Sequence, residues 1–85
     1  MKRERERLAL AHAIRRELAN LADGAADLEV QATSRGKAAA EAEARLAARR
    51  RRAKEALSQA DRFGLDPGLG EIATADRHAL ELPEQ

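Results

Sequence analysis

The sequence predicts an all-α protein, an antiparallel two-helix hairpin of coiled-coil-like character with a short C-terminal helix or tail. Apolar residues from Ala11 to Ala32 recur at alternating steps of three and four, which is the repeat of a coiled-coil seam. A second stretch, 37–63, is nearly free of helix breakers. Between the two lies Thr-Ser-Arg-Gly at 33–36, which is typical of a turn. These observations favour a hairpin over its alternative, an unbroken rod over 3–63.

The composition limits the core that this chain can build. Only one of its 85 residues is aromatic, and 21 are alanine, whose side chain buries little area. A core in so small a domain supplies about 3–5 kcal/mol, so association should add stability. We therefore expect a homodimer in which two hairpins form a four-helix bundle. The alternative is a marginally stable monomer that becomes ordered with a partner.

The chain has no cysteine, so it forms neither disulfides nor cysteine-based zinc sites, which fits a reducing compartment. Its charged N-terminus is not followed by the apolar segment of a secretory signal. Nor does it contain an apolar run of about 18 residues that could span a membrane. We expect a soluble, cytoplasmic protein without a membrane partner.

The first helix is predicted over residues 3–33. It opens with alternating Arg and Glu, which pair at spacings of three and four residues. Asp23 and Gly24 interrupt it with turn-forming residues, but the seam keeps its register across them. A continuous helix is therefore favoured over a break at Gly24. The predicted seam residues of this arm are Ile14, Leu18, Leu21, Ala25 and Leu28.

The turn is predicted at 34–36, where the hydroxyl side chains of the Thr-Ser pair are able to cap a helix start. The second helix follows over 37–63. At its end Gly64 should take the left-handed conformation, and Leu65 should pack back on the last turn. Small and apolar residues recur along one face of this helix, with Arg49 as the one charged position on that track. The predicted seam residues of this arm are Leu46, Ala53, Leu57 and Phe63.

Residues 64–85 form a second unit, distinct in composition from the hairpin at 1–63. They carry one basic and five acidic residues, whereas 36–63 carry eight basic and four acidic residues. A short amphipathic helix is predicted over about 71–82, and docking on the hairpin is favoured over binding to another protein. The acidic tail would then neutralise the basic helix, or compete with a polyanion for it.

Four consecutive arginines, Arg49–Arg52, are the sharpest local feature. At about 100° per residue they sweep about 300° around a helix, so at least one must meet the seam. The guanidinium group of arginine can donate two parallel hydrogen bonds to a phosphate, which suggests nucleic-acid contact. The favoured interpretation is a solvated face whose arginines pair with Glu55, Glu17 or the acidic tail, because the net charge is only +1 and no Trp or Tyr can stack on bases. The candidate nucleic-acid contacts are Arg45, Arg49, Arg50, Arg51, Arg52 and Lys54.

The residues that could carry catalysis are isolated from one another in the sequence. His12 and His78 lie in different segments and lack the spacing of metal ligands. Ser34 and Ser58 have no identifiable base. We expect no enzymatic activity, no metal or cofactor and no small-molecule substrate.

The basic helix closes on Phe-Gly-Leu-Asp-Pro at 63–67, which resembles the carboxyl end of some phage small terminase subunits. The resemblance covers five residues, and no other part of the chain extends it. The sequence as a whole predicts a non-enzymatic interaction or assembly module that acts through helix packing and a protein partner. The alternative is a nucleic-acid-binding accessory protein, of phage or mobile-element type, that uses Arg49–Arg52.

Overall fold

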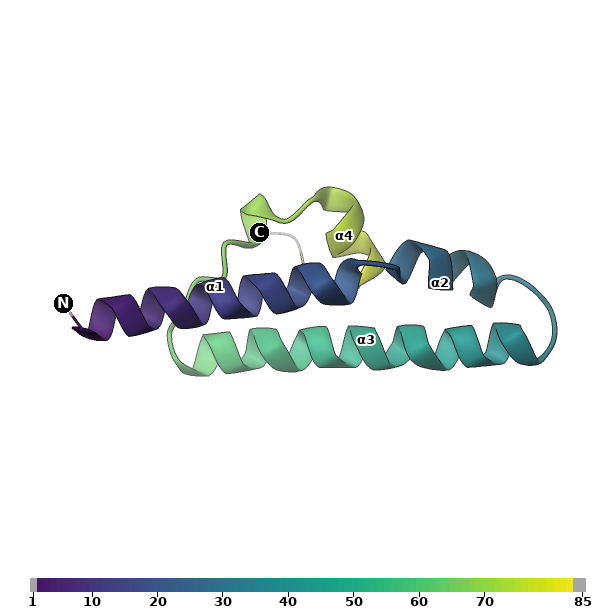
Figure 1. Cartoon of the computed structure of the whole chain (residues 1–85), viewed down its shortest axis with the longest axis horizontal. Coiled ribbons are helices and arrows are strands. Elements are labelled where there is room, and N and C mark those ends of the chain that lie inside the picture. The colour runs from purple at the N-terminus through teal and green to yellow at the C-terminus, as the bar shows by residue number, and fades with distance from the viewer. Residues whose placement is uncertain (1, 84–85) are drawn as a thin grey trace.

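The computed structural model describes residues 2–83, which form an elongated hairpin with a folded-back tail (Figure 1). Its principal extents are 54 × 19 × 16 Å. All regular secondary structure in these residues is helical, which confirms the predicted all-α class. In chain order the elements are α1 (Lys2–Ala22), α2 (Ala25–Ala32), α3 (Lys37–Arg62), a 3₁₀ turn η1 (Leu69–Glu71) and α4 (Thr74–Ala79).

Helices α1 and α2 form one arm of the hairpin, and α3 runs back along both of them (Figure 1). The first turns of α1 extend beyond the end of α3 (Figure 1). A connection at 33–36 separates the arms, as the sequence predicts. The antiparallel packing of two helical arms is therefore confirmed, and the unbroken rod is excluded.

The first arm is not one helix, so our prediction of a continuous helix over 3–33 is wrong at 23–24. Gly24 has a φ of 78°, a conformation that glycine adopts without the penalty a Cβ would impose. The Asp23 amide closes α1 by donating to the Ala19 carbonyl, and the Leu28 amide donates to the Gly24 carbonyl to start α2. The arm nevertheless continues along α3, because Ala25 directly after the break is fully buried.

The helix after the turn starts at a glycine and not at a side-chain cap. The Thr33 hydroxyl donates to the Val30 carbonyl at 2.6 Å, so it belongs to the end of α2. Gly36, with a φ of 91°, is the N-cap of α3 and makes no side-chain capping bond. The expected hydroxyl cap at the start of the second helix is therefore wrong. The helix starts instead at the backbone conformation with positive φ that Gly36 adopts.

The end of α3 has the backbone geometry that the sequence predicts. Gly64 is left-handed with a φ of 63°. The Leu65 amide donates to the Ala60 carbonyl at 2.8 Å, and the Gly64 amide donates to the Asp61 carbonyl at 3.1 Å. This pair of bonds is a Schellman motif, which satisfies carbonyls that the helix end would leave free. Leu65 packs against the core beside it.

The seam between the arms is built from leucine on one side and mostly alanine on the other. Leu18 in α1 is fully buried and lies in one cluster with Ala53 and Ala56 of α3. Of the predicted seam residues, Ile14, Leu18, Ala25, Leu46 and Ala53 are buried, and Leu21, Leu28 and Leu57 are half-buried. Small side chains let the two helix axes approach closely, so a chain poor in large residues still closes a core.

Phe63 is the exception among the predicted seam residues, because it does not pack in the core of the single chain. Its side chain is 59% exposed. The helical part of α3 ends at Arg62, so Phe63 sits at the helix cap rather than in the seam. Residues 3–10 of α1 are exposed, so this end of the hairpin offers no buried surface for an aromatic ring.

The tail docks on the hairpin, which is the arrangement that the sequence analysis favoured. The predicted single helix over about 71–82 is wrong. Ile72 is extended, with φ −80° and ψ 132°, and this separates η1 from α4. Ala75 is exposed, whereas Leu80 is fully buried. The tail contributes Leu69, Ile72, Leu80 and Leu82 to the same cluster as the two arms.

Candidate partner-binding surfaces

The acidic tail is tied to the basic arms by two arginines. Arg15 of α1 pairs with Glu71. Arg50 of α3 donates from Nε to the Ala79 carbonyl at 2.9 Å, and its Nη1 lies 3.3 Å from a Glu81 carboxylate oxygen. The tail therefore neutralises part of the basic helix within the molecule.

Arg49 is the arginine that meets the seam. Its Nη1 donates to the carbonyl oxygens of Asn20, Leu21 and Asp23 at 3.3, 3.0 and 3.1 Å. These carbonyls lie at the C-terminal end of α1, where the break at Gly24 removes their helical partners. A positive charge is also favourable at a helix C-terminus. The side chain thus acts as a cap supplied by the opposite arm.

We expect Arg49→Met to lower the free energy of unfolding by about 1.5–3 kcal/mol, the range for hydrogen bonds to a charged group. The physical reason is that the α1 carbonyls lose their donor while remaining partly shielded from water. Urea denaturation followed by circular dichroism measures the change. Arg51→Met is the matched control, because Arg51 is exposed. Equal stability of the two variants would mean that Arg49 does not stabilise the break between α1 and α2 at Gly24.

Arg52 is engaged on the other side of the hairpin. Its Nε donates to a Glu17 carboxylate oxygen at 2.7 Å, and its Nη1 reaches Glu55 at 3.5 Å. The hydrogen bond and negative charge of Glu17 raise the pKa of Arg52 above its usual value, so the guanidinium stays protonated. Three members of the arginine run therefore bind partners within the chain, which are the carbonyls of α1, the tail and Glu17.

One side of the hairpin is covered by the tail and the other is open. Two residues along a helix correspond to about 200°, so Glu17 and Arg52 point away from the tail that Arg15 and Arg50 bind. Leu10 lies seven residues before Glu17, and Phe63 lies eleven after Arg52, which returns each to the same side of its helix. We call the side that bears Leu10, Glu17, Arg52 and Phe63 the open flank.

Two large apolar side chains on the open flank face solvent. Leu10 is 50% exposed and Phe63 is 59% exposed. Because α1 and α3 are antiparallel and Arg7 donates to the Gly64 carbonyl at 2.6 Å, Leu10 and Phe63 lie at the same end of the hairpin. Arg7 thereby supports the cap of α3, a role that no local sequence signal indicated.

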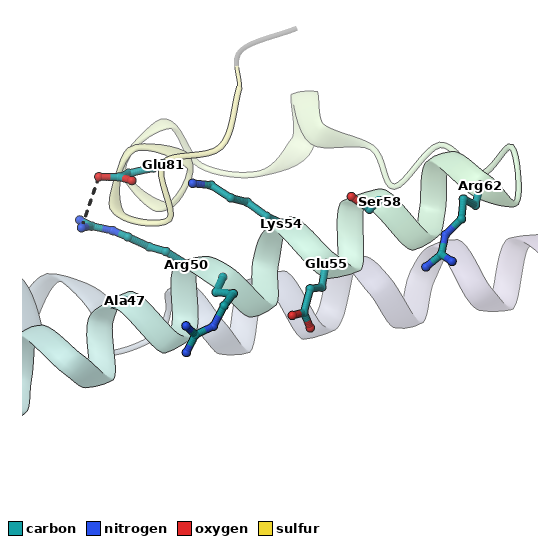
Figure 2. A pocket seen from close by; sticks show the side chains of 8 residues that line it. Ala47, Arg50, Lys54, Glu55, Ser58, Arg62 and Glu81 are labelled. Carbon is teal, nitrogen blue, oxygen red and sulfur yellow. Dashed lines mark ion pairs between the residues drawn. The ribbon is translucent and has the colours of Figure 1, made fainter.

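A basic groove of about 540 Å³ runs along the outer face of α3, beside the tail. Figure 2 shows Arg50 and Lys54 reaching toward the tail, and Arg62 farther along the same helix. Among the described residues, no ion pair or hydrogen bond engages Arg51, Lys54 or Arg62. The groove is lined by Ala47, Arg50, Arg51, Lys54, Glu55, Ser58, Arg62 and Glu81.

The predicted nucleic-acid contacts do not all lie on one surface, because only some of them line the groove. Arg50, Arg51 and Lys54 line it, while Arg49 and Arg52 face the first arm. Arg45 is exposed outside the groove. Ser58 and Arg62 also line the groove and were not among the predicted contacts, although their spacings of seven and eleven residues from Arg51 place them on its face.

The histidines and serines considered for catalysis do not come together. His12 is exposed, with its Nδ1 3.2 Å from Nη2 of Arg15. His78 is exposed on α4. Within residues 2–83, no group of three or more His, Cys, Asp and Glu side chains is arranged to hold a metal ion. In the same part of the chain, the helices are too short or too polar to cross a membrane.

Comparison with known proteins adds no family to these observations. No protein-family model, curated protein or solved structure matches the chain.

Proposed function

We propose that this chain is a non-enzymatic helical interaction module that pairs with a second copy through its open flank. The single observation that carries the proposal is the exposure of Leu10 and Phe63 at one end of that flank, opposite the side that the tail covers. A small domain gains stability when such side chains are buried against a partner. Two hairpins joined this way would form a four-helix bundle.

The middle of the open flank also suits self-association. Glu17 and Arg52 already pair with each other, and the Arg52 side chain is 52% exposed. In a symmetric pair each copy presents the same surface to the other, so a contact of Glu17 with Arg52 of the partner would be formed twice. An interface of standard size takes about 800 Å² from each partner. That is about an eighth of the 6169 Å² that the chain exposes.

We expect the wild-type chain to sediment as a dimer at tens of micromolar. The double variant Leu10→Asp/Phe63→Asp should sediment as a monomer and keep its helical circular dichroism, since both positions are exposed within one chain. Val30→Asp is the control, because Val30 is 69% exposed on α2, outside the open flank. A wild-type chain that is monomeric and melts cooperatively would refute the homodimer.

Nucleic-acid binding is the second candidate, and the free cations of the groove favour it. Arg51 and Lys54 are exposed there. Against it, Arg49, Arg50 and Arg52 bind groups of this chain, which reduces the charge that phosphates would meet. These intramolecular contacts leave fewer arginines for phosphates, so nucleic-acid binding stays the second candidate.

A further inference from the structure

The structure assigns the basic groove on α3 to an acidic helix of a second protein. This inference rests on the proposed role as an interaction module and names a partner for a surface that the homodimer does not use. The groove lies beside the tail, whereas the open flank faces away from it. Both surfaces could therefore be occupied in the same assembly.

The charge of the groove favours an anionic partner. It is lined by four basic and two acidic side chains. Arg51, Lys54 and Arg62 have no ion pair within the described part of the chain, so they are available to a partner. At the rim, the Glu81 carboxylate already lies 3.3 Å from Arg50, which shows that a carboxylate fits the chemistry of this surface (Figure 2).

The position of the acidic residues distinguishes a protein partner from a nucleic acid. Glu55 lies within the row of cations that extends from Arg51 to Arg62, a span of about 16 Å along the helix. A phosphate backbone has a uniform negative charge and would meet the carboxylates of Glu55 and Glu81, each of which is paired with a single guanidinium of this chain, that of Arg52 at 3.5 Å and that of Arg50 at 3.3 Å. A protein segment can place a basic residue opposite Glu55 and acidic residues opposite its neighbours.

The spacing of these charges defines the partner's pattern. A helix antiparallel to α3 would set acidic residues at positions i, i+8 and i+11 opposite Arg62, Lys54 and Arg51, and a basic residue at i+7 opposite Glu55. All four positions fall on one face of the partner helix, because their angles lie within about 100° of each other. The groove thus fits an amphipathic acidic helix with a single basic interruption.

The test uses a fluorescein-labelled helical peptide with Glu at i, i+8 and i+11 and Lys at i+7. Anisotropy is measured at low ionic strength with the full chain. We expect saturable binding that weakens about tenfold in Arg51→Gln/Lys54→Gln/Arg62→Gln, since three exposed ion pairs are lost together. The matched control is Arg35→Gln/Lys37→Gln/Arg45→Gln, which removes the same charge outside the groove and should bind like wild type.

Three results would overturn the assignment. The first is absence of peptide binding, and the second is equal binding of a peptide in which the three Glu are replaced by Gln. The third is tighter binding of a DNA duplex that depends on the same three cations, which would give the groove to nucleic acid. Sedimentation separates the two proposals, because the variant with three Gln in the groove should remain a dimer, whereas Leu10→Asp/Phe63→Asp should not. If the flank variant dissociates the dimer but the peptide does not bind, only the groove assignment fails.

Discussion

Leu80→Ala should lower the free energy of unfolding by about 2–5 kcal/mol, the usual cost of truncating a buried leucine. Leu80 is the fully buried tail side chain in the cluster that joins the tail to both arms. Its loss would leave a cavity under the tail and loosen the segment that carries Glu81. Urea denaturation followed by circular dichroism measures the effect.

Leu8→Ala is the matched control for this variant, because the same substitution is made at a side chain that is 60% exposed. The control should change stability by less than about 0.5 kcal/mol, as surface substitutions usually do. An unchanged denaturation midpoint for Leu80→Ala would contradict the docked tail. Since the Glu81 carboxylate pairs with Arg50 in the basic groove, loosening the tail should free that guanidinium and strengthen binding of the acidic peptide.

Leu18→Ala is expected to have an effect of the same size, about 2–5 kcal/mol, for a different reason. Leu18 is the fully buried leucine of the seam, and its partners across the arms include Ala53 and Ala56. Alanines cannot move far enough to fill the space that a leucine leaves. The free energy of unfolding of a single domain is about 5–15 kcal/mol, so the melting temperature of this variant should lie well below that of the wild type.

Val30→Ala serves as the comparison for Leu18→Ala, because Val30 is exposed on α2 and touches no part of the core. Thermal melting should leave this variant close to wild type. If Leu18→Ala melted together with Val30→Ala, the seam would not be the source of stability. The first arm would then need another anchor.

Much of the fold could be predicted because it depends on neighbours in the sequence. The alternating spacing of three and four placed Ile14 and Leu18 on the buried side of α1. The glycine signal at Gly64 predicted the Schellman motif, since a left-handed residue is needed there whatever surrounds it. The angular spread of Arg49–Arg52 predicted that at least one arginine would meet the seam.

Other features depended on groups brought together from distant parts of the chain. The break at Gly24 is accompanied by the guanidinium of Arg49, which lies 26 residues from Asp23 in sequence. The same residues could have formed a continuous helix, and only the approach of α3 supplied a donor for the opened carbonyls. The burial of Leu80 similarly followed from where the tail crosses the arms.

The sequence by itself determined the two arms, most of their seam and the glycine cap at Gly64, because periodicity and local backbone preference act over a few residues. Only the tertiary structure decided which charges remain available to partners. Arg50 and Arg52 are adjacent to Arg51 and chemically identical to it, yet each binds a group from another element while Arg51 is left in the groove. The physical reason is that an arginine's availability depends on the acceptors that the fold places within its reach.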